Sequence, residues 1–161
     1  TLPEFCAKRT LILGCGNRLF GDDGFGGRVV ECLYERYSIP DDAYVMDVGT
    51  GVRKLLFTLG LSPALQRRIV IIDAVDQGRS PGEIYEISLD DLPAEKADDF
   101  SLHQAPSTDL ARALKASGAE LRVLVCQVER IPLRVQPGLS APVAEAVPRM
   151  AAWIAREFFR R

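Results

Sequence analysis

Apolar residues in the first half of the chain occur in two patterns, short continuous runs and a four-residue period. Continuous runs at residues 10–15, 43–48 and 68–74 each end at a glycine or a polar residue, which is typical of buried strands. Apolar residues recur at every fourth position over residues 25–37, which predicts a helix with one apolar face. Strand and helix therefore alternate along this part of the chain.

The second half continues the alternation. Residues 83–89 alternate apolar and polar side chains, as a half-exposed edge strand does, and residues 121–128 form another apolar strand. Between them, residues 90–106 are acidic and lack a regular period, which predicts a long loop of a kind that is often functional. Ser107 or Thr108 can cap a helix that runs to about Gly118.

The last predicted element is a helix that follows Ser140, a residue type that caps helix N-termini. Its apolar positions between Val143 and Phe158 share one face. Pro148 falls inside this helix and predicts either a kink or a later start.

This order of elements predicts an α/β fold. We expect one domain, residues 1–161, built as a three-layer, doubly wound, twisted sheet of about five strands with helices on both faces. In such folds the carboxyl ends of the strands line the ligand crevice, so residues at those ends are the first candidates for function.

Composition narrows the classes of function. The net charge is −2 and charged residues make up 26% of the chain, so no basic surface for nucleic acid is indicated. No apolar run approaches the roughly 20 residues needed to cross a bilayer. The four cysteines form no Cys-x-x-Cys pair, and Cys15 and Cys126 lie in apolar runs, as buried free thiols do. We expect a cytoplasmic protein that binds neither nucleic acid nor membrane.

The loop after the first strand carries two adjacent carboxylates, Asp22 and Asp23. Gly14 and Gly16 begin a dinucleotide fingerprint, but Leu19 occupies the position of its third glycine. One of the two carboxylates can act as the cap of the following helix, and the other then needs a different explanation.

Three more polar residues stand where strands end or in the long loop. Asp73 ends the most apolar strand, Asp47 ends the second strand, and His103 is the only histidine. Each also has a structural interpretation, as a residue that binds loop amides or as an incidental surface residue. Together, Asp23, Asp73 and His103 form a set of two carboxylates and one imidazole, which suits a borderline divalent ion with open coordination positions.

Five motifs, in order, resemble those of the nickel–iron hydrogenase maturation endopeptidases. They are residues 16–26 (GNRLFGDDGFG), 47–51 (DVGTG), 72–74 (IDA), 101–104 (SLHQ) and 137–140 (PGLS). The resemblance covers nearly the whole chain and implies a five-stranded twisted sheet flanked by helices. It also implies an endopeptidase that removes the C-terminal extension from the precursor of a hydrogenase large subunit.

The resemblance further implies a metal-contacting set of Asp23, Asp73 and His103. By the same resemblance, we expect nickel to be supplied by the substrate and not permanently bound, and the partner to be the nickel-loaded large-subunit precursor. Many family members have Glu where this chain has Asp23, so Asp22 remains an alternative contact. Asp47 lies in a stretch similar to the aspartic-protease motif, and we interpret it as a loop-structural residue, with general base as the alternative.

Residues 11–17 (LILGCGN), 99–104 (DFSLHQ) and 125–129 (VCQVE) are most similar to the branch that serves the deazaflavin (coenzyme F-420)-reducing hydrogenase of methanogens. A competing hypothesis is a receiver-like phospho-acceptor signalling domain, with paired acids forming a magnesium pocket beside Asp73. A nucleotide- or flavin-binding module is another, in which Arg18 and the glycines meet phosphate at a helix N-terminus.

Overall fold

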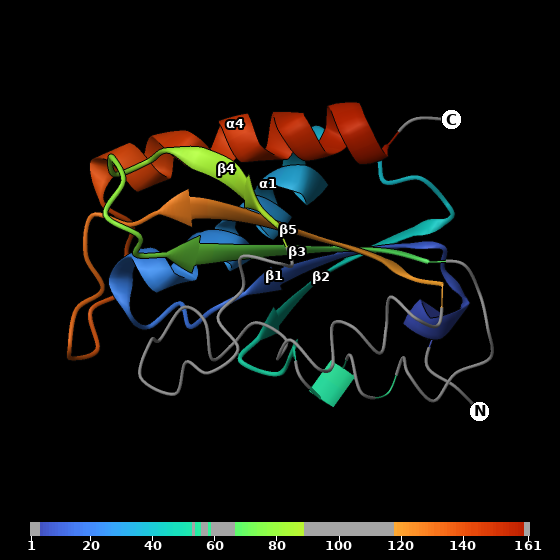
Figure 1. Cartoon of the computed structure of the whole chain (residues 1–161), viewed down its shortest axis with the longest axis horizontal. Coiled ribbons are helices and arrows are strands. Elements are labelled where there is room, and N and C mark those ends of the chain that lie inside the picture. The colour runs from blue at the N-terminus through green and yellow to red at the C-terminus, as the bar shows by residue number, and fades with distance from the viewer. Residues whose placement is uncertain (1–3, 53, 56–57, 59–66, 89–117, 160–161) are drawn as a thin grey trace.

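The computed structural model describes residues 4–52, 54–55, 58, 67–88 and 118–159. Five strands form one sheet in the order β2-β1-β3-β5-β4 (Figure 1). The elements are η1 Glu4–Ala7, β1 Thr10–Cys15, η2 Gly21–Gly24, α1 Phe25–Arg36, β2 Ala43–Gly49, β3 Arg68–Val75, β4 Ile84–Ile87, β5 Glu120–Gln127 and α4 Ala141–Phe158, where η denotes a 3-10 helix.

Four of the strands are parallel and one edge strand is antiparallel. β1 pairs with β2 and β3, and β3 pairs with β5, all in parallel register. β4 pairs with β5 in the antiparallel sense and forms one edge of the sheet, as the alternation of its side chains predicts. The three central strands therefore end at the same side of the molecule, where loops after β1, β3 and β5 meet.

Apolar cores cover both faces of the sheet. On one face, α1 and α4 lie side by side and bury the side chains of alternate strand positions, such as Ile12, Ile72 and Leu124 (Figure 1). On the opposite face, Leu13 and Ile71 belong to a second buried cluster that includes residues of η1. Burial on both faces explains why β1 and β3 are continuous apolar runs instead of alternating ones.

The predicted strands and the first helix are confirmed within one or two residues. The predicted later start of the last helix is wrong, because α4 begins at Ala141 and contains Pro148. Its buried face extends on both sides of the proline, from Val143 to Phe158, so packing holds the helix through it. The predicted long loop and the predicted helix after Ser107 or Thr108 lie outside the described residues.

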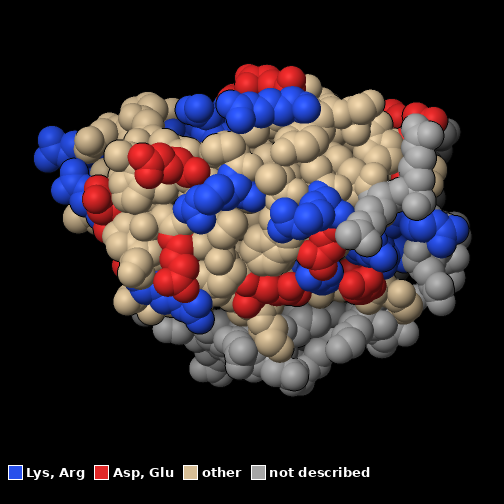
Figure 2. Space-filling view, turned by 90° about the horizontal axis from the view of Figure 1, so that it is seen from above, with Lys and Arg blue, Asp and Glu red and all other residues tan. Residues whose placement is uncertain are grey.

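The surface on the side of α4 carries both signs of charge, as the low net charge of the chain predicts. Acidic and basic side chains alternate over the face seen in Figure 2, so this face has no continuous basic field. Among the helices that the structure describes, none has the length and apolar character needed to cross a membrane.

Candidate functional site

Asp22 and Asp23 lie in the short turn η2, directly before α1, and both side chains are buried, with exposed fractions of 1% and 4%. Neither side chain caps α1. The N-cap position is Gly24, which makes no side-chain capping bond. The cap interpretation is therefore wrong, and the physical reason is that each carboxylate has partners elsewhere.

Asp22 fixes a distant loop to this turn. Its Oδ2 accepts hydrogen bonds from the backbone N–H of Glu129 at 2.9 Å and from the hydroxyl of Ser140 at 2.9 Å, with Arg130 N–H at 3.4 Å. Its Oδ1 accepts from the backbone N–H of Ser140 at 2.7 Å. Ser140 occupies the N-cap position of α4, but its hydroxyl binds Asp22 instead of capping the helix. Both oxygens of Asp22 are thus engaged in holding the loop.

Asp23 is held by the loop that follows β1. Its Oδ2 accepts a hydrogen bond from the backbone N–H of Asn17 at 2.8 Å. Gly16 has a φ of 115°, and a Cβ atom there would lie 2.1 Å from the carbonyl oxygen of Asp23 and 3.2 Å from its Oδ1. Glycine is therefore needed at position 16 both for backbone conformation and for the close approach of Asp23.

Asp73 lies two residues before the end of β3 and is 1% exposed. Its Oδ1 accepts a hydrogen bond from the backbone N–H of Ala74 at 2.8 Å. A carboxylate at the end of an otherwise apolar central strand matches the position expected from the sequence, the mouth of the crevice at the carboxyl edge of the sheet.

Asp47 lies near the end of β2 and is exposed. Its Oδ1 accepts a hydrogen bond from the backbone N–H of Gly49 at 3.0 Å, and its Oδ2 lies 3.6 Å from Nε of Arg18. The loop-structural interpretation of Asp47 is consistent with both contacts. Its alternative role as a general base stays a prediction.

Cys15, the last residue of β1, lies at the same edge of the sheet as these carboxylates. Burial raises the pKa of Cys15 well above its ordinary value, and the negative charges of Asp73, Asp47 and Asp23 raise it further. The strand register gives the arrangement directly, because Gly14 of β1 pairs with Asp47 of β2 and with Ile72 of β3, the residue before Asp73. The carboxylates of η2 and of the strand ends therefore lie at one edge of the sheet, although 50 positions separate Asp23 from Asp73 along the chain.

His103 lies outside the described residues, so its position relative to Asp23 and Asp73 stays a prediction. Within the part of the chain that the structure describes, no three histidine, cysteine or acidic side chains form a ready metal-binding group. The described site therefore supplies two buried carboxylates of the predicted set.

Arg18 is a site residue whose role the sequence did not reveal. Its guanidinium lies 2.6 Å from Glu31 of α1 and, through Nε, 3.6 Å from Asp47. It links α1 to the end of β2 beside the carboxylates. The ion pairs join positions 13 and 29 residues apart, so no local pattern in the sequence indicated them.

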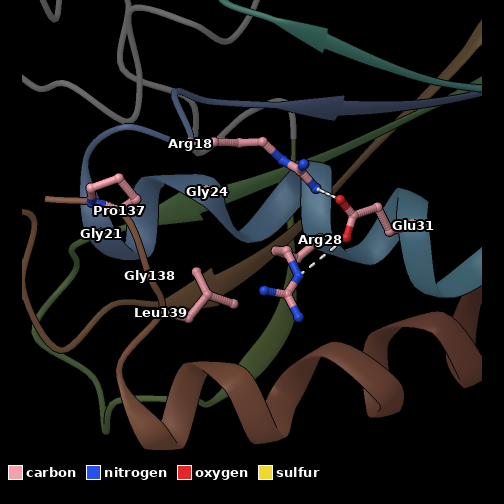
Figure 3. A pocket seen from close by; sticks show the side chains of 8 residues that line it. All are labelled: Arg18, Gly21, Gly24, Arg28, Glu31, Pro137, Gly138 and Leu139. Atoms are coloured by element: carbon pink, nitrogen blue, oxygen red, sulfur yellow. Dashed lines mark ion pairs between the residues drawn. The ribbon is translucent and has the colours of Figure 1, made fainter. Parts of the chain in front are cut away.

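An open cavity of about 220 Å³ adjoins the site (Figure 3). Arg18, Arg28 and Glu31 line one side of it, and the two arginines both pair with Glu31. Residues 137–139 line the other side. The cavity is bounded by the loop after β1 and by the loop that Asp22 holds.

The receiver-like alternative and the nucleotide-binding alternative find no support in this geometry. A receiver-like site needs a lysine at the end of the fifth strand, but β5 ends at Gln127, whose side-chain oxygen accepts hydrogen bonds from Gln77 and Arg79. A phosphate at the loop after β1 would face the buried carboxylates of Asp22 and Asp23, which repel it.

Comparison with known proteins gives one consistent result. A family model described as hydrogenase maturation protease matches residues 27–157. A putative hydrogenase maturation protease of Methanocaldococcus jannaschii is 39% identical over 143 residues, which cover 88% of this chain and 91% of the relative. The coenzyme F-420 hydrogenase subunit delta of Methanothermobacter thermautotrophicus is 30% identical over 151 residues, 91% of this chain and 92% of the relative.

Solved structures agree with the sequence comparisons. The hydrogenase maturating endopeptidase HybD of Escherichia coli superposes with a TM-score of 0.70 at 29% identity, covering 92% of this chain and 93% of that one. The five-stranded sheet flanked by helices is shared with that protein.

Proposed function

Because the chain belongs to the hydrogenase maturation protease family, we propose that it is the endopeptidase that removes the C-terminal extension from the precursor of a nickel–iron hydrogenase large subunit after nickel insertion. The relationship to a protein named as a subunit of the coenzyme F-420 hydrogenase supports that enzyme's large subunit as the substrate.

One observation carries the proposal. Asp73 and Asp23 lie at the carboxyl edge of the sheet, Asp73 near the end of β3 and Asp23 against the loop that follows β1, and both are almost completely buried. Buried carboxylates that share one place are costly unless a positive charge or hydrogen bonds compensate them. A divalent cation presented by a substrate is therefore attracted to this edge.

The three predicted metal contacts, Asp23, Asp73 and His103, each have a defined role in the proposal. Asp23 and Asp73 contact the nickel that the precursor carries, and His103 supplies the third contact from the long loop. Carboxylate oxygen and imidazole nitrogen suit a borderline ion and leave positions for the precursor's own ligands. The nickel then acts as a template that places the scissile bond beside these side chains.

Asp22 and Asp47 support this set without contacting the ion. Both oxygens of Asp22 already bind Ser140 and the neighbouring loop amides, which favours Asp23 over Asp22 as the acidic contact from η2. Asp47 binds Gly49 and Arg18, so it shapes the loop after β2.

The decisive experiment uses two forms of the large-subunit precursor from the chain's own organism, one loaded with nickel and one nickel-free. Each is incubated with the protein and the product is read by mass spectrometry. We expect loss of the C-terminal extension from the nickel-loaded form only. Equal cutting of both forms would show that nickel is not the recognition element, and cutting of neither would refute the proposed activity.

Two variants and one control test which residues are needed for cleavage. Asp73→Asn and His103→Ala should abolish cutting while the circular dichroism spectrum stays that of the wild type. Asp41→Asn, which changes an exposed carboxylate in the turn before β2, is the matched control and should cut normally. Normal processing by Asp73→Asn or His103→Ala would show that the site is wrongly assigned.

A further inference from the structure

Exposed apolar side chains gather on one part of the surface. Among the residues that the structure describes, four large apolar side chains are exposed, and three of them lie on two loops beside the candidate site. These are Leu19, exposed by 50%, Leu133, exposed by 92%, and Val135, exposed by 61%. Single exposed apolar residues are ordinary on protein surfaces, but several on adjoining loops indicate a contact surface.

The two loops are joined by backbone hydrogen bonds. The N–H of Gln136 donates to the carbonyl of Leu19 at 2.7 Å, and the N–H of Gly21 donates to the carbonyl of Gln136 at 2.8 Å. Phe20 and Gln136 form an isolated parallel bridge between them. We refer to residues 17–21 and 130–139 as the paired loops.

The paired loops are fixed in place as well as to each other. Asp22 follows the first loop, and it accepts hydrogen bonds from Arg130 and Ser140 at the two ends of the second loop. Pro132 and Pro137 further restrict the backbone of that loop. A surface that is already ordered binds a partner at a lower entropic cost than one that must become ordered on binding.

The second loop presents two exposed basic side chains, Arg130 and Arg134, directly after the exposed Glu129. Arg18 and Arg28 line the cavity beside this loop, and Glu31 pairs with both of them (Figure 3). The basic side chains available to a partner here are therefore those of Arg130 and Arg134. A segment that carries apolar side chains together with an acidic one therefore complements this surface.

We propose that the paired loops are a docking surface for an extended, apolar and acidic segment of the hydrogenase large-subunit precursor next to the scissile bond. Leu19, Leu133 and Val135 contact its apolar side chains, and Arg134 meets its acidic side chain. Asn17 at the start of the paired loops binds Asp23, so a segment seated there lies directly beside the carboxylates. This inference rests on the proposed function.

Steady-state cleavage of the nickel-loaded precursor tests the docking surface. Leu133→Ser removes an apolar contact without opening the core, because Leu133 is almost fully exposed. We expect the KM for the precursor to rise about tenfold, as loss of one apolar contact does, while kcat is unchanged. Leu133→Met keeps an apolar side chain and should restore the KM. Arg134→Glu should raise the KM most strongly at low salt.

Two controls separate docking from stability. Thermal melting should give the same Tm for Leu133→Ser and wild type, since the side chain is not packed. Tyr34→Ser removes the fourth exposed apolar side chain, which lies on α1 with its hydroxyl bound to the Val45 carbonyl, and should leave the KM unchanged.

The outcomes distinguish the two proposals. If the wild-type protein cuts no nickel-loaded precursor, the proposed function fails and the docking surface fails with it. If the wild type cuts and Leu133→Ser has the same KM, only the docking surface is overturned. A wild-type dimer that Leu133→Ser converts to a monomer in sedimentation would assign the paired loops to a second copy of this chain and also overturn the proposal.

Discussion

The carboxylate of Asp22 accepts hydrogen bonds from both the backbone amide and the side-chain hydroxyl of Ser140, although 118 positions separate the two residues. One buried side chain thus joins the turn before α1 to the start of α4. Asp23 directly follows Asp22 in η2. The hydrogen bonds between Asp22 and Ser140 therefore order the second of the paired loops and also anchor the turn that presents Asp23.

Asp22→Ala should lower the free energy of unfolding by about 2–4 kcal/mol, because it leaves the amides of Glu129 and Ser140 and the Ser140 hydroxyl without their acceptor. Ser140→Ala removes one of these donors and should cost only about 1 kcal/mol. Urea unfolding measures both values. Asp41→Ala, at an exposed carboxylate, is the control, and a loss for Asp22→Ala as small as that of the control would contradict the assignment.

Gly16→Ala should impair cleavage by displacing Asp23. The new Cβ would lie 2.1 Å from the Asp23 carbonyl oxygen, so the turn must shift. A displacement of about 1 Å at a reacting group can cost a hundredfold in rate, and we expect a loss of that order.

Gly78→Ala is the matched control for that variant. Gly78 also has a positive φ, 73°, but nothing lies within 4 Å of a Cβ placed there. Both variants bear the backbone strain of about 1–2 kcal/mol that a side chain has in this conformation. Only Gly16→Ala should lose cleavage. Similar cleavage rates for the two variants would show that the position of Asp23 is not critical.

The fold was predictable because its central strands and helices have strong local patterns. β1 and β3 each contain a continuous apolar run because both faces of the sheet are covered, and the four-residue period of α1 marks its buried face. The later start expected for α4 was wrong for a physical reason. Packing of the apolar face of α4 on both sides of the proline outweighs the local cost, and the local sequence carries no measure of that packing.

The site was predictable only in part. Asp73 stood out as a carboxylate near the end of an apolar strand, and Asp23 as one of two adjacent acids after the first loop. The structure buries both, and their role as metal contacts stays a prediction. The partners of Asp22 and the ion pairs of Arg18 were not found, since each joins residues that meet only after the sheet has formed. The cap interpretation of the paired acids failed because Asp22 binds amides of a distant loop and Asp23 binds the amide of Asn17 in the preceding loop.

Glu157 should make stability depend on acid pH. Burial acts to raise the pKa of Glu157, but hydrogen bonds from Arg122 and Trp153 outweigh it and leave the pKa below its ordinary value of 4.5. A carboxylate with a lowered folded-state pKa stabilises the protein above its unfolded pKa, and this stabilisation is lost as the pH falls through the folded-state value.

Glu157→Gln should therefore be less stable than the wild type at pH 7, and the difference should shrink as the pH falls below 4.5. Glu157 is partly exposed, so the difference at pH 7 should stay below about 1 kcal/mol. Urea unfolding across this pH range measures it. Glu145→Gln, at an exposed position of the same helix, should show no such convergence, and a constant difference for Glu157→Gln would refute the role of the ion pair.

Asp47→Asn separates the two roles that the sequence left open for Asp47. The amide oxygen of Asn can still accept the hydrogen bond of the Gly49 N–H, although the ion pair with Arg18 is lost. If Asp47 only shapes the loop, the variant should therefore keep most of its cleavage activity. We expect cleavage of the nickel-loaded precursor to fall by less than about tenfold, whereas loss of a general base costs about 10²–10⁴-fold. Asp73→Asn, measured in parallel, should show no cleavage. A loss of a hundredfold or more for Asp47→Asn, with an unchanged Tm and a normal KM, would instead place Asp47 among the residues that take part in hydrolysis.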